Sequence, residues 1–237
     1  MKNIARASER TLAQIFEPAF LRVFFLGILT TFLAMIATWF LAGYLKDQIT
    51  LTHFDWQWVN DVFQWFLDID WIFNIVFFFL MGIFFPPIAT IFMSLYLDDI
   101  IDAVEDKYYP DHKAGKRLGM GHLAYLALRL ALMIIMLNIL VIPLYLFFFW
   151  LAFVPLVIFY VLNSYLLGWG YYEMVAVRHL GIREAGRHRK SIRGQILLGG
   201  FVITLLYSLP VVNLLAPILG AALLAHLFHL SLRERGN

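Results

Sequence analysis

Apolar residues fill four long intervals that contain no Asp, Glu, Lys or Arg, at residues 23–45, 71–97, 130–172 and 194–232. An α-helix rises about 1.5 Å per residue, so crossing about 30 Å of hydrocarbon takes about 20 residues. The first two intervals therefore predict single membrane-spanning helices at about 20–45 and 71–97. The last two are long enough to form helical hairpins at about 122–172 and 195–232.

A proline divides each of the two predicted hairpins into two arms. Pro143 divides the first hairpin, and both of its arms are long enough to cross the bilayer. Pro210 divides the second hairpin, whose first arm is only about 22 Å long over residues 195–209. This length predicts a re-entrant or strongly tilted hairpin with its apex at residues 209–213. Backbone at such an apex is tolerated only against protein or water, so the apex either borders a permeation path or is a tightly packed bend.

Composition supports the same class of protein. Of the 237 residues, 62% are hydrophobic and 14% are charged, whereas soluble domains average about 45–50% and about 25%. The charged side chains are too few to cover so much apolar surface in water. A soluble enzyme, a disordered chain and a nucleic-acid-binding domain are therefore excluded. We expect an all-α integral membrane protein that forms a single domain over residues 1–237.

The positions of the basic residues predict the orientation in the membrane. Seventeen of the 18 Lys and Arg residues precede the first span, follow the second span, separate the two later intervals or end the chain. Lys46 alone lies between the first two spans. Because Lys and Arg favour the cytoplasmic side, both termini are predicted to be cytoplasmic and residues 46–70 to face outward. Each later interval then enters and leaves the membrane on the same side, as a hairpin does.

Arg129 is the least expected charge, because it follows the apolar run of residues 123–128. A cation at membrane depth costs about 2.5–3.5 kcal/mol on insertion scales, so Arg129 is expected to face protein or water and to have a partner. Glu173 lies at a similar predicted depth and is the nearest partner by topology. The pair would present an anion-attracting guanidinium. The alternative is an arginine that extends to the cytoplasmic interface.

Arg22 begins the first predicted span, shortly after Pro18. Proline suits the first turn of a helix, where free N–H groups beside a guanidinium would favour an oxyanion. The alternative is a plain anchor on the cytoplasmic side.

The remaining polar residues form no recognisable catalytic or metal-binding motif. Asp98 and Asp102 begin an acidic face with helical spacing, which is expected to contact the basic segment 183–193 rather than to bind a cation. His226 and His229 are three residues apart, but no carboxylate shares their helix at a spacing suited to a metal. Cysteine is absent, and no Ser/His/Asp arrangement is present. We therefore predict no metal, no cofactor and no enzymatic activity.

Four segments resemble those of a known family. Residues 206–217 read Leu-Tyr-Ser-Leu-Pro-Val-Val-Asn-Leu-Leu-Ala-Pro, and residues 171–173 precede a basic stretch that ends at Arg193. Residues 125–129 end in arginine, and residues 18–24 begin with proline. In their order along the chain, these segments resemble those of the CysZ-type sulfate permeases, and the match is strongest at residues 206–217.

This resemblance implies a bacterial inner-membrane protein that admits sulfate for cysteine biosynthesis. It implies two long spanning helices and two hairpins that only partly penetrate the membrane, assembled as dimers or larger homo-oligomers. It also implies an anion site at the family's Gly-Ile/Leu-Arg-Arg motif. The matching residues here are Ala19, Phe20, Leu21 and Arg22, so the glycine and the first arginine of the motif are replaced.

We therefore expect a permease or channel for sulfate or a related oxyanion, seated in the lipid bilayer and without a nucleic-acid partner. Arg22 would recruit the anion, Arg129 with Glu173 would set the field inside, and the apex from Pro210 to Asn213 would border the pore. The alternative is a non-transporting membrane scaffold or stress-related factor of the same fold.

Overall fold

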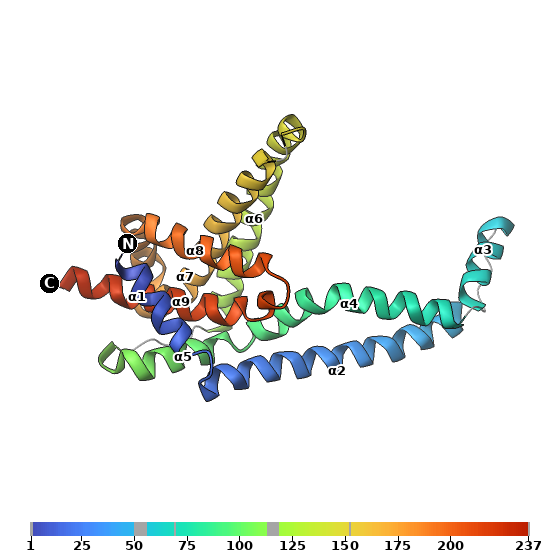
Figure 1. The fold of residues 1–237 in the computed structure, drawn as a ribbon, viewed down its shortest axis with the longest axis horizontal. Coiled ribbons are helices and arrows are strands. Elements are labelled where there is room, and N and C mark those ends of the chain that lie inside the picture. The colour runs from blue at the N-terminus through green and yellow to red at the C-terminus, as the bar shows by residue number, and fades with distance from the viewer. Residues whose placement is uncertain (1, 50–55, 69, 113–118, 152, 237) are drawn as a thin grey trace. The chain divides into compact units, whose positions relative to one another are not determined.

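The computed structural model describes residues 2–49, 56–68, 70–112, 119–151 and 153–236, and every regular element within these ranges is helical (Figure 1). The chain divides into two compact units, Met1–Phe24 with Tyr96–Asn237, and Phe25–Leu95. The elements in order are α1 (Lys2–Ala13), α2 (Pro18–Ile49), α3 (Gln57–Asp68), α4 (Asp70–Ser94), α5 (Leu97–Tyr108), η1 (Pro110–His112), α6 (Met120–Phe148), α7 (Phe153–Ser191), α8 (Arg193–Ser208), η2 (Val212–Leu214) and α9 (Ala216–Gly236).

Five of the described helices contain a segment that is long and apolar enough to cross a membrane. These segments are Pro18–Leu45, Asn74–Ser94, Ala124–Phe148, Phe153–Ser191 and Ala216–Arg233. The two long apolar helices predicted at about 20–45 and 71–97 are thus present as α2 and α4. The apolar helix α8 has only 16 residues, which corresponds to about 24 Å.

In the unit Phe25–Leu95, α2 and α4 run side by side (Figure 1). The Phe32 and Phe85 ring centroids are 5.2 Å apart, and Trp39 Nε1 donates a hydrogen bond to Asn74 Oδ1 over 3.3 Å. Most of the large apolar side chains on both helices stay exposed. Such helices suit hydrocarbon, where exposed apolar surface carries no penalty.

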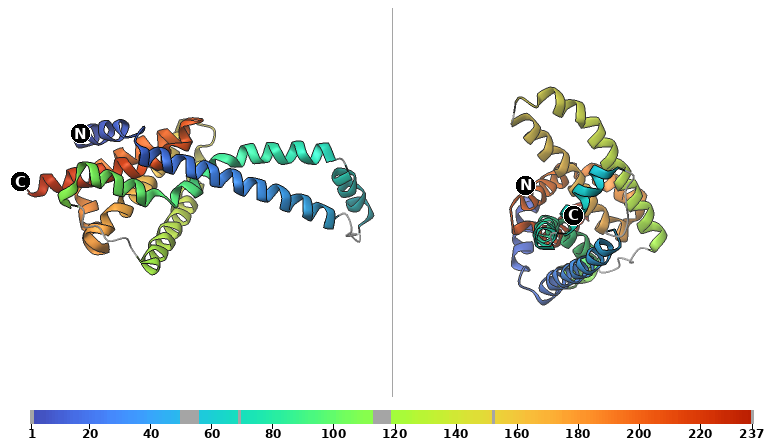
Figure 2. Two further views of the ribbon diagram at one scale, coloured as in Figure 1. Left: turned by 90° about the horizontal axis from the view of Figure 1, so that it is seen from below. Right: turned by 90° about the vertical axis from the view of Figure 1, so that its right-hand side faces the viewer.

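In the other unit, α9 forms the centre, with α1, α5, α7 and α8 packed around it. Figure 2 shows α5 (green) and α8 (orange) alongside α9 (red). Ala221, Ala222, Leu224 and Ala225 on α9 are completely buried. The small side chains among them let neighbouring helices approach α9 closely.

α7 and α8 approach each other so closely that backbone meets backbone. A Cβ atom at Gly200 would lie 1.8 Å from the Ser164 carbonyl oxygen, and one at Gly168 would lie 2.5 Å from the Ile196 carbonyl oxygen. Only a hydrogen atom fits at either position. These two glycines therefore set the distance between the helices.

The break between α6 and α7 differs from the prediction. It was expected at Pro143, but α6 continues through this proline to Phe148, and the turn follows at residues 149–151. Proline removes one helical N–H, and membrane helices tolerate this where nearby groups satisfy the freed carbonyl. The second arm also extends beyond the predicted end at residue 172, because α7 continues to Ser191 with a bend at Gly181, where φ is 71°.

The connection between α8 and α9 lies where Pro210 predicts it. α8 ends at Ser208, α9 begins at Ala216, and η2 lies between them. Val211 has a φ of 68°, a left-handed conformation that is strained for a β-branched residue. The depth to which this helix pair enters a membrane stays a prediction.

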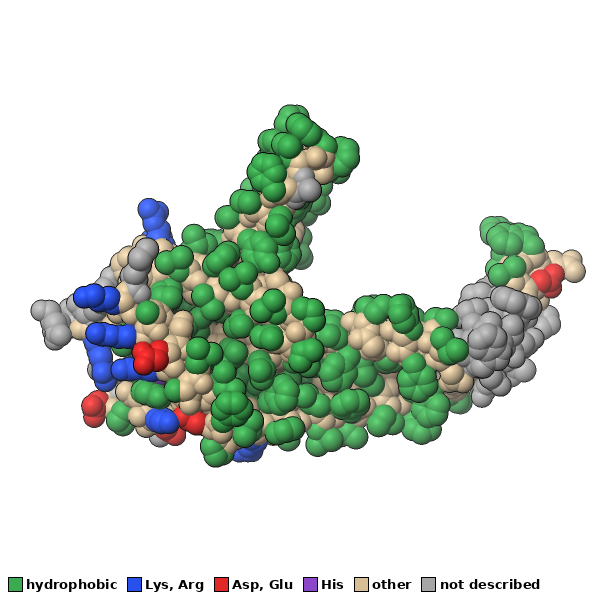
Figure 3. Space-filling view, in the orientation of Figure 1, with side chains coloured by type: hydrophobic (Ala, Val, Ile, Leu, Met, Phe, Trp, Pro, Cys, Tyr) green, Lys and Arg blue, Asp and Glu red, His purple; other side chains and the backbone are tan. Residues whose placement is uncertain are grey.

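Charged and apolar side chains occupy different parts of the unit centred on α9. Figure 3 shows Lys and Arg side chains (blue) gathered where α1 and the end of α9 lie, while hydrophobic side chains (green) cover the α6–α7 pair. The charged end is suited to water, and the surface of the α6–α7 pair is suited to lipid.

Candidate functional site

Arg129 and Glu173 lie together, as their positions in the sequence predict. Arg129 Nη1, on α6, donates a hydrogen bond to Glu173 Oε1, on α7, over 3.3 Å. The Glu173 side chain is 12% exposed and the Arg129 side chain 34% exposed. Arg129 therefore contacts protein through Glu173 and is partly accessible from outside the protein. The contact is confirmed, whereas a role in attracting an anion stays a prediction.

Arg189 joins this pair from the last turn of α7. Its Nη1 atom lies 3.9 Å from Glu173 Oε1, which is too far for a hydrogen bond. The Arg189 guanidinium lies 3.7 Å from the centroid of the Trp169 ring, and that of Arg129 lies 5.2 Å from the same centroid. Two arginines therefore share one carboxylate and one aromatic ring.

A cavity of about 420 Å³ opens beside this group, between the end of α7 and the start of α8. Trp169, Arg189, Lys190 and Arg193 line its polar side, and Ile196 belongs to its apolar wall. No acidic side chain is among the described residues that line it. Most of the lining is apolar, and its three basic residues favour an anionic ligand.

Two residues that line this cavity each have a buried hydrogen-bond donor with no acceptor among the described residues. Trp169 Nε1 and Arg189 Nη1 are buried, and neither atom is hydrogen-bonded within the described residues. The Trp169 residue as a whole is 3% exposed. Buried N–H groups are nearly always paired in native proteins, so these two are suited to an acceptor that does not come from the chain. These two donors could not be identified from the sequence, because neither charge pattern nor spacing links Trp169 to Arg189.

The residues of the predicted anion motif lie at the start of α2. Pro18 is the first residue of this helix, as expected. Phe20 is buried, Ala19 is partly buried, and Leu21 and Arg22 are exposed. In the described part of the chain, Arg22 has no ion pair and does not line the cavity beside Arg189. Its role in anion binding stays a prediction.

Pro210 and Asn213 lie in the connection between α8 and α9. Leu209 and Val211 beside them are exposed, while the buried Oδ1 atom of Asn213 accepts no hydrogen bond from the described residues. No hydrogen bond or ion pair in those residues joins this connection to the Arg129–Glu173 pair. Whether it borders a permeation path stays a prediction.

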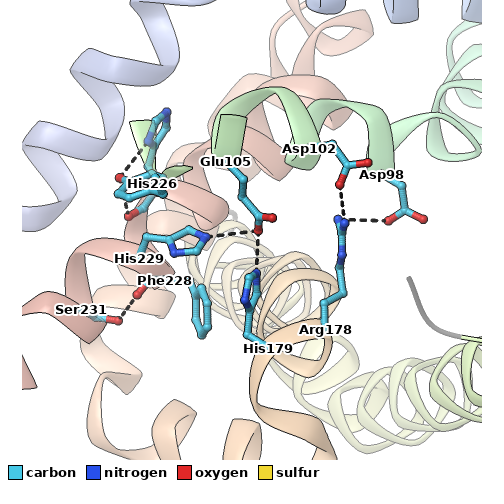
Figure 4. A network of polar contacts seen from close by, with 10 residues as sticks. Asp98, Asp102, Glu105, Arg178, His179, His226, Phe228, His229 and Ser231 are labelled. Atoms are coloured by element: carbon cyan, nitrogen blue, oxygen red, sulfur yellow. Dashed lines mark hydrogen bonds and ion pairs between the residues drawn. The ribbon is translucent and has the colours of Figure 1, made fainter. Parts of the chain in front are cut away.

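A second polar cluster lies where α5, α7 and α9 meet (Figure 4). Arg178 on α7 forms an ion pair with Asp102, and its Nη1 atom lies 3.8 Å from Asp98 Oδ1. The acidic face of α5 was expected to contact residues 183–193, and for these two aspartates that partner was wrong. The bend at Gly181 changes the direction of α7 before that segment begins.

Glu105, on the same helix as Asp102, contacts two histidines. His179 Nε2 lies 2.7 Å from Glu105 Oε1, and His229 Nε2 lies 3.2 Å from it. Burial by itself would raise the pKa of Glu105, but the hydrogen bonds from His179 and His229 and their charges lower it to about 2. The carboxylate is therefore ionised at neutral pH. The spacing of the histidines on α9 could not reveal this partner, because Glu105 lies on another helix, 124 residues before His229.

A family model matches most of the chain. The family is EI24, described as sulfate transporter CysZ and etoposide-induced protein 2.4, and the match covers residues 7–217. This range includes the Arg129–Glu173 pair and the cavity beside Arg189. No curated protein and no solved structure matches the chain.

Proposed function

Since the chain belongs to the EI24 family of the sulfate transporter CysZ and etoposide-induced protein 2.4, we propose that it is a sulfate permease. It would act in the bacterial inner membrane with both termini in the cytoplasm, and the sulfate would supply cysteine biosynthesis. The five apolar helices support a multi-pass membrane protein. The observation that carries the proposal is the basic cavity lined by Trp169 and Arg189, each of which has a buried N–H group without an acceptor among the described residues.

The donors around this cavity match the chemistry of sulfate, a tetrahedral dianion whose four oxygens all accept hydrogen bonds. A guanidinium offers N–H groups in a fixed fork that fits two oxygens of such an anion, and the indole N–H offers another donor. Arg189, Lys190 and Arg193 supply positive charge. A buried oxyanion would thus satisfy both donors and offset the excess charge.

Glu173 limits how tightly the anion is held. Its carboxylate lies 3.3 Å from Arg129 Nη1 and 3.9 Å from Arg189 Nη1, so it neutralises part of the positive charge beside the cavity. Conduction requires binding that is strong enough for entry and weak enough for release. The shared carboxylate supports a site that sulfate occupies only briefly.

Other residues would act before or after this cavity. Arg22 would recruit sulfate at the exposed start of α2, and Arg129 would set the electrostatic field between the helices. The connection from Pro210 to Asn213 would border the path. The chain would act without a cofactor, as a homodimer or larger homo-oligomer in the lipid bilayer, and no catalytic role is proposed for it.

Uptake of radiolabelled sulfate into proteoliposomes that contain the full chain tests the proposal. The Arg189→Gln variant should lower the initial rate of uptake about 10-fold to 100-fold, because a hydrogen bond to a charged group contributes about 1.5–3 kcal/mol. Arg187→Gln is the matched control. Arg187 lies on the same helix, is 76% exposed at its side chain and pairs with Glu184, so its loss should leave uptake unchanged.

Size-exclusion chromatography establishes that both variants are folded before uptake is compared. Uptake no faster than in empty liposomes, by folded wild-type protein, would overturn the proposed function. Equal uptake by Arg189→Gln and wild type would overturn the assignment of the cavity.

The family description also names an etoposide-induced protein, and this supports an alternative, a non-transporting membrane scaffold or stress-related factor. Growth of a bacterium that lacks sulfate uptake distinguishes the two. Rescue by the wild type but not by Arg189→Gln supports the permease. Absence of rescue, together with a protein partner that co-purifies in stoichiometric amount, supports the alternative.

A further inference from the structure

Three helices bring three potential metal ligands to one point. Glu105 comes from α5, His179 from α7 and His229 from α9, and one ligand atom from each lies within 4.8 Å of the other two (Figure 4). Both histidines point their Nε2 atoms at Glu105 Oε1, at 2.7 and 3.2 Å. None of these residues lines the cavity beside Arg189, so the proposed sulfate permeation leaves this cluster unexplained.

The imidazole rings are held in position by their neighbours. His229 stacks on Tyr109, with ring centroids 4.3 Å apart and an angle of 18° between the planes. His179 packs against Phe228 at 5.4 Å and meets His229 edge to face at 5.1 Å. Glu105 and His229 are only 2% and 1% exposed. The ligand atoms are therefore ordered before any ion binds, which lowers the entropic cost of binding.

The ligand types indicate which ion fits. Two imidazole nitrogens and one carboxylate oxygen are a set that Zn²⁺ binds, at about 2.0–2.2 Å from each atom. Tetrahedral bonds of this length place neighbouring ligand atoms about 3.3 Å apart. The His229–Glu105 separation of 3.2 Å already fits, and the His179–Glu105 separation of 2.7 Å needs to lengthen by about half an ångström. We propose that Glu105, His179 and His229 form a binding site for a divalent transition-metal ion, with Zn²⁺ as the best match.

A bound ion would connect three helices that are distant in the sequence. Because the three ligands come together only in the folded protein, part of the binding free energy would stabilise the contact between α5, α7 and α9. Three protein ligands also leave one position of a tetrahedral ion open to a water molecule or a small anion. This open position distinguishes the site from structural zinc sites, in which four protein ligands surround the ion.

Zn²⁺ itself is the probe. The full chain, produced without a polyhistidine tag and stripped with EDTA, should bind about one Zn²⁺ per chain by elemental analysis and calorimetry, with a rise in unfolding temperature. Co²⁺ should give visible absorption bands that Zn²⁺ abolishes. Because the chain has no cysteine, these bands should lack a thiolate charge-transfer component.

Glu105→Gln and His229→Gln should each weaken Zn²⁺ binding at least about 100-fold, since each removes a direct ligand. His226→Gln is the matched control and should leave Zn²⁺ binding unchanged. His226 lies on the same helix and is equally buried, but it contacts Gln14 and Tyr109 instead of Glu105.

Absence of stoichiometric Zn²⁺ and of Co²⁺ bands in the wild type would overturn the proposal, and so would equal Zn²⁺ binding by His229→Gln and wild type. If the ligand variants fail to fold, the Co²⁺ spectrum of the wild type still decides. Sulfate uptake has no part in these measurements, so failure of the permease proposal and failure of this one are separate results.

Discussion

α6 and α9 are both apolar helices of the same compact unit, but their surroundings are opposite. The most apolar stretch of α6 has a mean hydropathy of 2.6, and only 6% of it is buried inside the protein. The corresponding stretch of α9 has a mean hydropathy of 1.3, and 89% of it is buried. The less apolar helix is therefore the one in the interior.

This difference indicates that the burial of apolar surface away from water does not determine which of the two helices lies in the interior. Lipid hydrocarbon is as apolar as leucine, so an apolar helix gains little by leaving lipid for the protein interior. Close packing of small side chains and hydrogen bonds between polar groups favour association instead. In these two helices, high hydropathy thus accompanies a surface suited to lipid, whereas small and polar residues accompany contact with protein.

The polar residues of α9 support this interpretation. His226 contacts Gln14 and the Tyr109 hydroxyl at 2.9 and 3.1 Å, and His229 contacts Glu105. The exposed Asn138 on α6 behaves differently, since its Nδ2 atom donates to the Ile134 carbonyl of its own helix. Polar groups hold α9 to its neighbours, whereas the Asn138 amide of α6 is satisfied within its own helix.

The largest loss of stability is expected when a buried glycine gains a methyl group. Gly200→Ala should destabilise the protein by about 3 kcal/mol or more, because the new Cβ atom would clash with the backbone of Ser164 and Gly168. The same change at Gly82 in α4, where no atom lies within 4 Å of a Cβ position, should be neutral or slightly stabilising. Unfolding followed by circular dichroism in detergent micelles measures both. Similar effects at the two glycines would contradict the backbone contact between α7 and α8.

A smaller effect is expected where a leucine side chain is shortened in each environment. Leu224→Ala on α9 should cost about 2–4 kcal/mol, because Leu224 is completely buried and its removal leaves a cavity. Leu140→Ala on α6 should cost less than about 1 kcal/mol in the same assay, since Leu140 is 68% exposed and lipid can fill the space. A larger loss for Leu140 than for Leu224 would reverse the comparison between the two helices.

The smallest change in stability is expected when a hydroxyl group is removed, which tests the hydrogen bonds rather than the packing. Tyr109→Phe should cost about 1–2 kcal/mol, because the hydroxyl accepts a hydrogen bond from Arg10 Nη1 at 3.0 Å and contacts His226 Nδ1. Tyr125→Phe removes an exposed hydroxyl from α6 and should change stability by less than about 0.5 kcal/mol. Chemical denaturation of the two variants provides the measurement. Equal stabilities would show that the polar contacts around α9 contribute nothing net.

Features that depend on one segment of the chain could be predicted from the sequence. The lengths of the apolar intervals indicate α2 and α4, because spanning a bilayer requires a fixed number of residues. Pro210 indicates the connection between α8 and α9, and the unusual depth of Arg129 indicates its pairing with Glu173. The break predicted at Pro143 was wrong because proline alone does not end a helix in a membrane.

Groups assembled from several helices could not be predicted in the same way. Glu105 is 74 residues from His179 and 124 from His229, so no local period joins them. The preference of Asp102 for Arg178 over the basic segment 183–193 depends on where α7 bends. Such contacts follow from packing angles, which the hydrophobic pattern of a single helix does not contain.

The backbone contact at Gly168 and Gly200 also constrains motion. Sliding α8 along α7, or rotating it, would place a side chain where only hydrogen fits. If the chain acts as the proposed permease, the two helices are therefore expected to move together as one rigid body when the path opens and closes. The displacements that open and close a path would then occur in the two connections that flank this helix pair. These are the turn at residues 149–151 before α7 and the connection around Val211 after α8.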